Sequence, residues 1–202
     1  MIHLFGHWKP WCCSIFNDTI EHLVNRYRQL LYFDRGRLNL EQIRQYAEVV
    51  EEKSGVPDIW AFIDGTIRPI CRPSTFPQRP FYTGYKKCHG FKFQGLSFPD
   101  GIISMAGPFE ASAGDWRMWH DSNIEQELRS IFGEGRDAPF YIYGDPAYSG
   151  AYGVLGAYTR VGGRTLLRDE KVFNIIMAQV RITIEQLFGN VLVIWGFSGH
   201  KY

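Results

Sequence analysis

An α/β fold with a mixed sheet is predicted by three features of the sequence. Short runs of aromatic and β-branched residues, typical of buried strands, occur at 59–63 and 140–143. Two further runs, 91–98 and 102–106, flank a Pro-Asp-Gly sequence at 99–101 that is typical of a hairpin turn. Segments with helical spacing of apolar residues lie before, between and after these strands. The 202 residues, of which 45% are hydrophobic, are enough for one compact unit with a buried core.

Two amphipathic helices are expected before the first strand. Between residues 15 and 31, apolar side chains recur every three or four positions, and Asn17 or Asp18 is expected to cap this helix. A second helix is expected to begin at an Asn39 cap and to end at Gly55.

The remaining elements complete an α/β order. Ser122 is expected to cap a helix that ends at Gly133, and a long helix is expected over 169–188. The chain then reads as one strand, a hairpin pair, a helix, a strand and a final helix. Three antiparallel strands followed by a crossover helix and a parallel strand match the RNase H-like arrangement. We therefore expect an RNase H-like α/β fold, a mixed sheet of about five strands with flanking helices, preceded by the helical pair.

Three acidic residues occupy positions at which their side chains can converge. Asp64 follows the first expected strand, Asp145 follows the last, and Glu185 lies on the final helix. Three carboxylates around one point repel strongly unless cations neutralise them, and hard oxygen ligands suit Mg²⁺ or Mn²⁺. Two such ions activate a water or a 3′-hydroxyl and stabilise the leaving oxygen in phosphodiester cleavage. The pattern therefore predicts a divalent-metal site formed by Asp64, Asp145 and Glu185.

Short motifs occur in a specific order along the chain. They are FIDGT at 62–66, YTGYKKCHG at 82–90, FQ at 93–94, PDG at 99–101, GDPAY at 144–148, FN at 173–174 and RITIEQLFG at 181–189. In order and spacing, across residues 15 to 195, they resemble PIF/Harbinger-type DDE transposases and the nucleases derived from them. The resemblance implies an RNase H-like DDE endonuclease that cuts DNA with a divalent metal.

The resemblance also implies roles for single residues. By their positions in the motifs, Asp64 and Asp145 resemble the two catalytic aspartates, and Glu185 resembles the glutamate of the triad. The Gly-Asp pair that ends at Asp115 resembles the family's Gly/His-Asp segment, although the sequence around it differs, so Asp115 is a further candidate. Arg181, one helical turn before Glu185, is expected to hold a DNA phosphate or to orient the glutamate.

A basic and aromatic stretch without any acidic residue extends from Arg68 to Phe93. Cations that alternate with aromatic rings suit phosphate contacts and base stacking, whereas a solvated hairpin is the alternative interpretation. The net charge of +1 conceals this local basic surface, and DNA is therefore the expected partner. The candidate DNA-contacting residues, including one on the last helix, are Arg68, Arg72, Lys86, Lys87, His89, Lys92 and Arg181.

Both ends of the chain depart from the family pattern. The chain begins where family members have further upstream helices, and it ends 17 residues after Glu185, at residue 202. We interpret 1–57 as an N-terminal helical segment, a remnant of the region upstream of the catalytic core, and 58–202 as a C-terminally short DDE nuclease domain. The alternative function is a truncated, catalytically inactive DNA- or partner-binding remnant, and a fragment that does not fold alone is a third possibility.

The sequence also bears on partners and location. It contains no stretch of eighteen apolar residues, so no membrane partner is expected. A separate DNA-binding partner protein and an oligomeric state are both compatible with this interpretation. Nuclear localisation is expected only from the DNA substrate that the resemblance implies.

Overall fold

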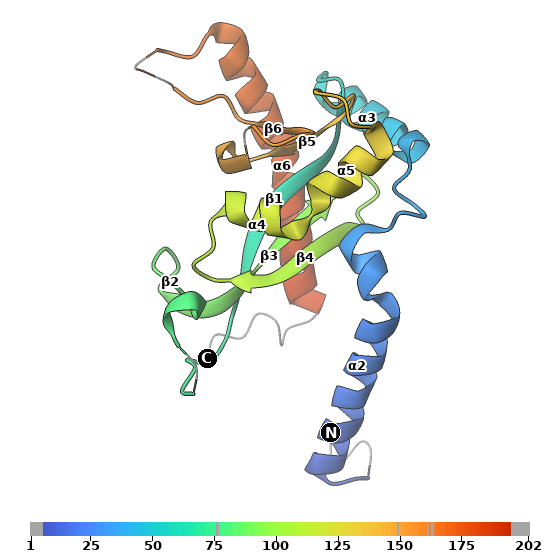
Figure 1. Cartoon of the computed structure of the whole chain (residues 1–202), viewed down its shortest axis with the longest axis vertical. Helices are drawn as coiled ribbons and strands as arrows, with labels where there is room; N and C mark the ends of the chain where they lie inside the picture. The colour runs from blue at the N-terminus through green and yellow to red at the C-terminus, as the bar shows by residue number, and fades with distance from the viewer. Residues whose placement is uncertain (1–5, 76, 149, 161, 163, 195–202) are drawn as a thin grey trace.

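The computed structural model describes residues 6–75, 77–148, 150–160, 162 and 164–194; within the last helix the side chains of 183–188 and 190–194 are not described. A curled mixed sheet forms its centre (Figure 1). The strands are β1 (Ile59–Pro69), β2 (Tyr82–Thr83), β3 (Cys88–Ser97), β4 (Ile103–Glu110), β5 (Tyr141–Gly144) and β6 (Val154–Gly156).

The sheet combines an antiparallel and a parallel part. β3 pairs antiparallel with β1 and with β4, and it also pairs with the short strand β2. β5 lies on the other side of β1 and runs parallel to it, and β6 continues this parallel part. The expected mixed α/β sheet is thus confirmed, and the strands β2 and β6 are additions that the sequence pattern did not predict.

Helices cover both faces of the sheet. Figure 1 shows α4 and α5 in front of the sheet and α6 behind it. The larger core cluster includes Trp60 and Leu128, and a smaller cluster joins Met177 of α6 to Phe62 and Tyr143 of the sheet. The helices are α2 (Lys9–Phe33), α3 (Leu40–Ser54), α4 (Asp115–Ser122), α5 (Ile124–Phe132) and α6 (Arg168–Ile194), with single 3-10 turns η1 (Arg79–Phe81) and η2 (Pro146–Tyr148).

The α3 helix begins and ends as predicted. The Asn39 side chain accepts a hydrogen bond from the Gln42 amide at 3.0 Å, which satisfies one of the free N–H groups of the first turn. Gly55 adopts a left-handed conformation with φ of 70°, and its N–H donates to the Glu51 carbonyl. Ile43 is fully buried on the face of α3 that packs on the sheet.

The predicted cap of the first helix is wrong. The α2 helix begins at Lys9, with Trp8 as its N-cap, so Asn17 and Asp18 lie inside it. Pro10 explains the earlier start, because the first turn tolerates a residue that lacks an N–H group. Neither α2 nor any other helix within the described ranges is long and apolar enough to span a membrane.

The predicted cap of the α5 helix is also displaced. Asn123, in a left-handed conformation with φ of 57°, precedes α5, whereas Ser122 is the last residue of the unpredicted helix α4. The Ser122 hydroxyl still accepts a hydrogen bond from the Ile124 amide at 3.3 Å. Two helices separated only by Asn123 thus lie where the sequence predicted the start of one helix. Gly133 follows α5 as predicted.

The first strand does not end at Asp64, contrary to the sequence prediction. β1 continues to Pro69 because β3 pairs with it as far as the Pro69–Gly90 pair. Its parallel pairing with β5, in contrast, ends at the Phe62–Tyr143 pair. Asp64 therefore lies inside a strand, at the point where one of the strand's two neighbours stops.

Candidate active site

The first two predicted acidic residues lie at matching positions beside each other: Asp64 is within β1, and Asp145 directly follows the neighbouring strand β5. In the parallel pairing of β1 with β5, the last register pair joins Phe62 to Tyr143. Asp64 and Asp145 each follow that pair by two residues. Because side chains of a strand alternate between faces, Asp64 lies on the same face as Phe62, next to the point where the chain leaves β5 at Asp145.

The Asp64 carboxylate is largely buried and paired with a cation. Its Oδ1 atom accepts hydrogen bonds from Arg181 Nη2 at 2.8 Å and from the Gly65 amide at 2.9 Å. Burial raises the pKa of Asp64 above its ordinary value of 3.8, although the Arg181 guanidinium and the Gly65 amide oppose the rise; the charge of Asp145 adds to it. Burial and the Arg181 ion pair thus act on the pKa of this carboxyl group in opposite directions.

Asp115 approaches the same place from the opposite face of the sheet. It is the first residue of α4, and its Oδ1 atom lies 3.3 Å from the position that a Cβ atom on Gly65 would occupy. Burial raises the pKa of Asp115; the charge of Lys92 opposes this rise and that of Asp145 increases it. The absence of a side chain at Gly65 thus leaves room for Asp115 beside the acidic pair.

A buried tyrosine underlies the three aspartates. Tyr148, in the turn η2 that follows Asp145, is 1% exposed, and Gln94 Nε2 lies 3.3 Å from its hydroxyl oxygen. Burial raises the pKa of Tyr148, and the charges of Asp115, Asp145 and Asp64 raise it further. The phenol therefore stays protonated, so its O–H remains a hydrogen-bond donor close to the carboxylates.

The α6 helix brings Arg181 to the site. Met177, one turn earlier, is buried against the sheet in the cluster that contains Phe62, and this contact sets the height of Arg181 beside Asp64. Arg181 Nε is buried without a hydrogen-bond partner among the described residues. Glu185 lies in α6 one turn beyond Arg181, and its side chain lies outside the described residues.

A family model described as DDE superfamily endonuclease matches residues 63–200 of the chain. The chain belongs to this superfamily. The matched region begins one residue before Asp64 and includes Asp145 and Glu185. Membership of the DDE superfamily implies an RNase H-like fold, in agreement with the mixed sheet. No curated protein and no solved structure matches the chain.

The fit of this DDE site to a divalent metal depends on its oxygen donors. Among the described residues, no three His, Cys, Asp or Glu side chains are grouped closely enough to hold one ion. Asp64 and Asp145 are nevertheless neighbouring carboxylates, the donor type that hard cations prefer, and a guanidinium already balances the charge of Asp64. The donor chemistry thus fits a divalent cation if Glu185, whose side chain lies outside the described residues, supplies the third carboxylate.

The structure separates the candidate DNA-contacting residues into two groups. Arg181 and Lys92 lie beside the carboxylates, and the Lys92 amine donates a hydrogen bond to the Ala113 carbonyl. The other candidates, which lie beyond Asp64 on β1 or in the segment from there to the start of β3, are Arg68, Arg72, Lys86, Lys87 and His89.

The hairpin formed by β2 and β3 carries exposed rings next to cations. Tyr85 is 88% exposed, with the Lys86 amine 5.0 Å from its ring centroid. The rings of Tyr82 and His89 have centroids 5.2 Å apart. Pro69, which pairs with Gly90, lies five residues beyond Asp64 on β1, so the hairpin lies about 16 Å along the sheet from the acidic residues.

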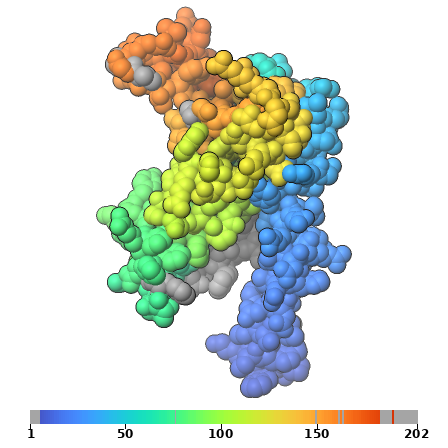
Figure 2. Space-filling model, in the orientation of Figure 1, coloured from blue at the N-terminus to red at the C-terminus, as the bar shows by residue number. Residues whose placement is uncertain are grey.

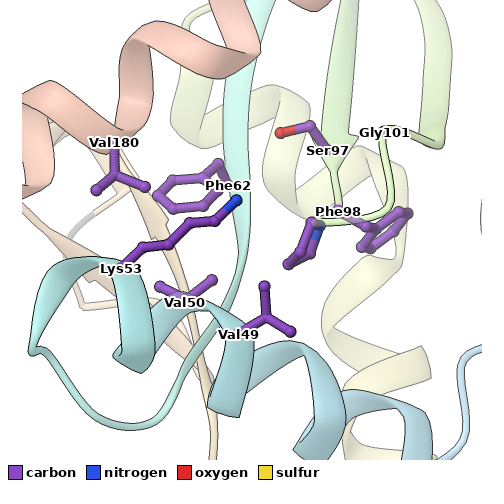
Figure 3. Close-up of a pocket in the computed structure, with 9 residues that line it drawn as sticks. Val49, Val50, Lys53, Phe62, Ser97, Phe98, Gly101 and Val180 are labelled. Carbon is purple, nitrogen blue, oxygen red and sulfur yellow. The ribbon is translucent and has the colours of Figure 1, made fainter.

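An apolar cavity of about 100 Å³ lies behind β1, between α3 and α6 (Figure 3). Val50 and Val180 point toward Phe62 across it, and Lys53 extends along its edge. Neither Asp64 nor Asp145 lines this cavity. It is therefore separate from the acidic site and does not extend it.

Two site residues were not singled out from the sequence. Tyr148 and Gln94 lie inside motifs that carried the family resemblance, but a tyrosine three residues after Asp145 has no signal of its own. The antiparallel register places Gln94 opposite Gly65, and only this pairing brings it under the site. Helix α4, which positions Asp115, was likewise not predicted.

Proposed function

We propose that the chain is a metal-dependent DNA endonuclease of the PIF/Harbinger type. The observation that carries the proposal is that Asp64 and Asp145 each lie two residues beyond the last β1–β5 pair, where β1 loses β5 as its neighbour. Superfamily membership supports nuclease chemistry and DNA as the substrate. The ends of strands in α/β sheets are the usual position of such sites.

In this proposal, Asp64, Asp145 and Glu185 hold Mg²⁺ or Mn²⁺, and Asp115 contributes from the opposite face. The metal supplies Lewis acidity toward the phosphate and lowers the pKa of a bound nucleophile. Arg181 balances the charge of Asp64 before a metal binds, and its guanidinium is then available for a phosphate oxygen. Tyr148 remains protonated, so it adds no negative charge beside the carboxylates, and its hydroxyl accepts a hydrogen bond from Gln94.

The DNA contacts are proposed to lie along one path from the site to the hairpin. Lys92 and Arg181 are close to the acidic residues and suit the phosphate that reacts. Lys86, Lys87 and His89 suit phosphates further along the DNA strand. Arg68 on β1, opposite Phe91 of β3, lies between the two groups, and Arg72 lies beyond the end of β1. We infer a nuclear location only from the resemblance to PIF/Harbinger proteins, and we assign sequence recognition to a separate DNA-binding protein.

A catalytically inactive DNA- or partner-binding protein is the second candidate. The observation that favours it is the Arg181–Asp64 ion pair, because a guanidinium at 2.8 Å already occupies the carboxylate that a metal requires. In that case the fold and the basic hairpin are retained for binding, whereas turnover is lost.

Cleavage of a supercoiled plasmid with Mg²⁺ or Mn²⁺ distinguishes the two candidates. The endonuclease proposal expects nicked or linear product from the native chain and none from Asp64→Ala. Asp137→Asn is the matched control, since this exposed aspartate lies in the loop before β5, away from the site. DNA binding without metal-dependent cleavage in the native chain would instead support the inactive protein.

A further inference from the structure

The chain leaves β6 directly beside the proposed active site. β6 runs parallel to β5, and the last register pair joins Gly144 to Gly156. Asp145 follows the first of these residues and Ala157 follows the second, so both segments leave the sheet at the same edge. Paired strands lie about 4.8 Å apart. The segment after β6 (residues 157–160) is therefore a close neighbour of Asp145.

A single asparagine fixes the segment after β6. The Asn174 side chain accepts a hydrogen bond from the Tyr158 N–H and donates one to the Tyr158 carbonyl, each at 2.9 Å. These two bonds satisfy both backbone groups of Tyr158, as a neighbouring strand would. Asn174 lies on α6 seven residues before Arg181, which is two helical turns or about 10 Å along the same face. The helix that brings Arg181 to Asp64 therefore also holds the segment after β6.

The Tyr158 ring is both supported and accessible. Its centroid lies 5.3 Å from that of the Phe173 ring, which in turn lies 5.9 Å from the buried ring of Tyr143. Tyr158 nevertheless remains 49% exposed. Together with Thr159 and Arg164, it lines an open groove of about 590 Å³ beside β6. A ring that is already held in place loses little conformational entropy when it stacks on a second ring.

The order of the strands places this segment across the site from the basic hairpin. In the order β2-β3-β1-β5-β6, the strands that position Asp64 and Asp145 are β1 and β5, so the hairpin lies on one side of them and β6 on the other (Figure 1). Figure 2 shows the hairpin (green) and the chain that follows β6 (orange) at opposite ends of the body. A DNA strand that contacts the hairpin and continues past the acidic residues therefore meets the segment after β6.

The charges that follow β6 suit DNA. Between positions 157 and 171 the charged residues are Arg160, Arg164, Arg168, Asp169, Glu170 and Lys171. Arg164 and Glu170 pair with each other, which leaves three cations and one carboxylate. Arg160, two residues after Tyr158, is exposed and forms no ion pair within the described part of the chain. An exposed ring beside an available cation suits base stacking combined with a phosphate contact.

We propose that the segment after β6 is a second DNA contact of the site, in which Tyr158 stacks on an unpaired base and Arg160 binds a phosphate. Asn174 is the positioning residue that fixes Tyr158 for this contact. The inference rests on the proposed endonuclease function and adds a contact on the side of the reacting phosphate that lies away from the hairpin. Because every base has a π-face, this stacking provides affinity for unpaired DNA and not sequence recognition.

Binding measured in EDTA tests the contact independently of cleavage. The probes are two fluorescein-labelled duplexes of equal paired length, one blunt and one with a short single-stranded overhang. The native chain should bind the overhang duplex about tenfold more tightly, a factor typical of one base stacked on an aromatic ring. Tyr158→Ala should lose this preference, and Tyr158→Phe, which keeps the ring, should retain it. Tyr27→Ala, at a tyrosine that is 45% exposed on α2, is the matched control and should retain it too.

A double-variant comparison tests the positioning role of Asn174. Asn174→Ala should lose the preference for the overhang, and adding it to Tyr158→Ala should weaken binding no further, because both changes remove the same contact. Asn174→Asp still accepts from the Tyr158 N–H but cannot donate to the carbonyl, so its effect should be intermediate. Thermal unfolding of each variant shows that the body remains folded, and the Tyr158 variants test the contact whatever the stability of Asn174→Ala.

Three results would overturn the inference. A native chain that binds both duplexes equally has no contact with an unpaired base, and a preference that survives Tyr158→Ala excludes stacking on this ring. Equal losses in Tyr158→Phe and Tyr158→Ala would assign the contact to the hydroxyl group. Failure of the endonuclease proposal gives a different pattern: the native chain cleaves no plasmid, whereas a preference that depends on Tyr158 still supports the DNA contact.

Discussion

The two halves of β1 have the same strand conformation but different surroundings. From Ile59 to Ile63 the strand has β5 on one edge, and every side chain is buried. From Asp64 to Pro69 only β3 pairs with it, and its side chains are half-buried or exposed. The sequence changes at the same point, from an aromatic and β-branched run to Asp-Gly-Thr.

This difference explains where the candidate site lies. Once β5 ends, one edge of β1 is open, so groups from both faces of the sheet can meet around it. Arg181 reaches Asp64 from the α6 side, whereas Asp115 approaches Gly65 from the α4 side. The first half of the strand therefore provides rigidity, and the second half provides access.

The largest expected effect is on cleavage. Asp64→Asn and Asp145→Asn should each lower the rate of metal-dependent DNA cleavage by about 10³-fold or more, because each removes a charged metal ligand. Asp137→Asn should cleave at the native rate. Loss of activity in the control as well would mean that any change of surface charge, and not the open half of β1, matters.

The next effect contrasts the two halves directly through stability. Ile63→Ala, in the fully buried half, should lower the free energy of unfolding by about 2 to 5 kcal/mol. Ile67→Ala is the matched variant on the same face of the open half, and it should cost about 1 kcal/mol because this side chain is only partly buried. If urea denaturation showed the same loss in free energy of unfolding for both variants, the proposed difference between the two halves of β1 would be wrong.

The order of the main strands and part of the site could be predicted from the sequence. The elements that were missed depend on contacts between distant residues or are too short to show a pattern. The start of α3 at the Asn39 cap and the turn at 99–101 could be predicted because a few adjacent residues determine each of them. The true end of β1 depends on its pairing with β3, a contact between residues far apart in the chain. The short strand β6 has only three residues and no periodicity to detect.

The same limit applies to the site. Asp64 and Asp145 could be selected because each follows a buried run, and the structure brings them together. Asp115 depends on helix α4, whose N-terminus has no side-chain cap, and Tyr148 reaches the site only because the fold packs it against Trp119 of that helix. The domain boundary between 57 and 58, and the assignment of Glu185 to the triad, stay predictions.

A smaller effect is expected from filling the space at Gly65. A methyl group there would meet Asp115 Oδ1 and Met118 Cε, each at 3.3 Å, so Gly65→Ala should displace the α4 side of the site. We expect about tenfold weaker Mn²⁺ binding in calorimetry, since a displaced supporting group typically costs this much. Gly135→Ala, whose added methyl would make only an ordinary contact at 3.5 Å, should bind like the native chain.

The smallest effect concerns acid pH. Burial raises the folded-state pKa of Asp64 and of Asp115, so their contribution to stability is greatest below the ordinary value of 3.8 and is lost as the pH rises through the raised values. Asp64→Asn should therefore gain stability relative to the native chain between pH 4 and 7. If urea denaturation gave the same difference in free energy of unfolding between the two proteins at every pH in this range, the burial of the Asp64 carboxylate would be contradicted.

The most direct test of the central claim is Mn²⁺ titration calorimetry on the native chain and on Asp145→Asn, with and without a duplex oligonucleotide. If Asp64 and Asp145 form one metal site at the open edge of β1, the native chain binds Mn²⁺ in at least one of the two conditions, and the variant binds at least about tenfold more weakly. Equal affinity in the two proteins, or no binding to the native chain even with DNA, would contradict the account.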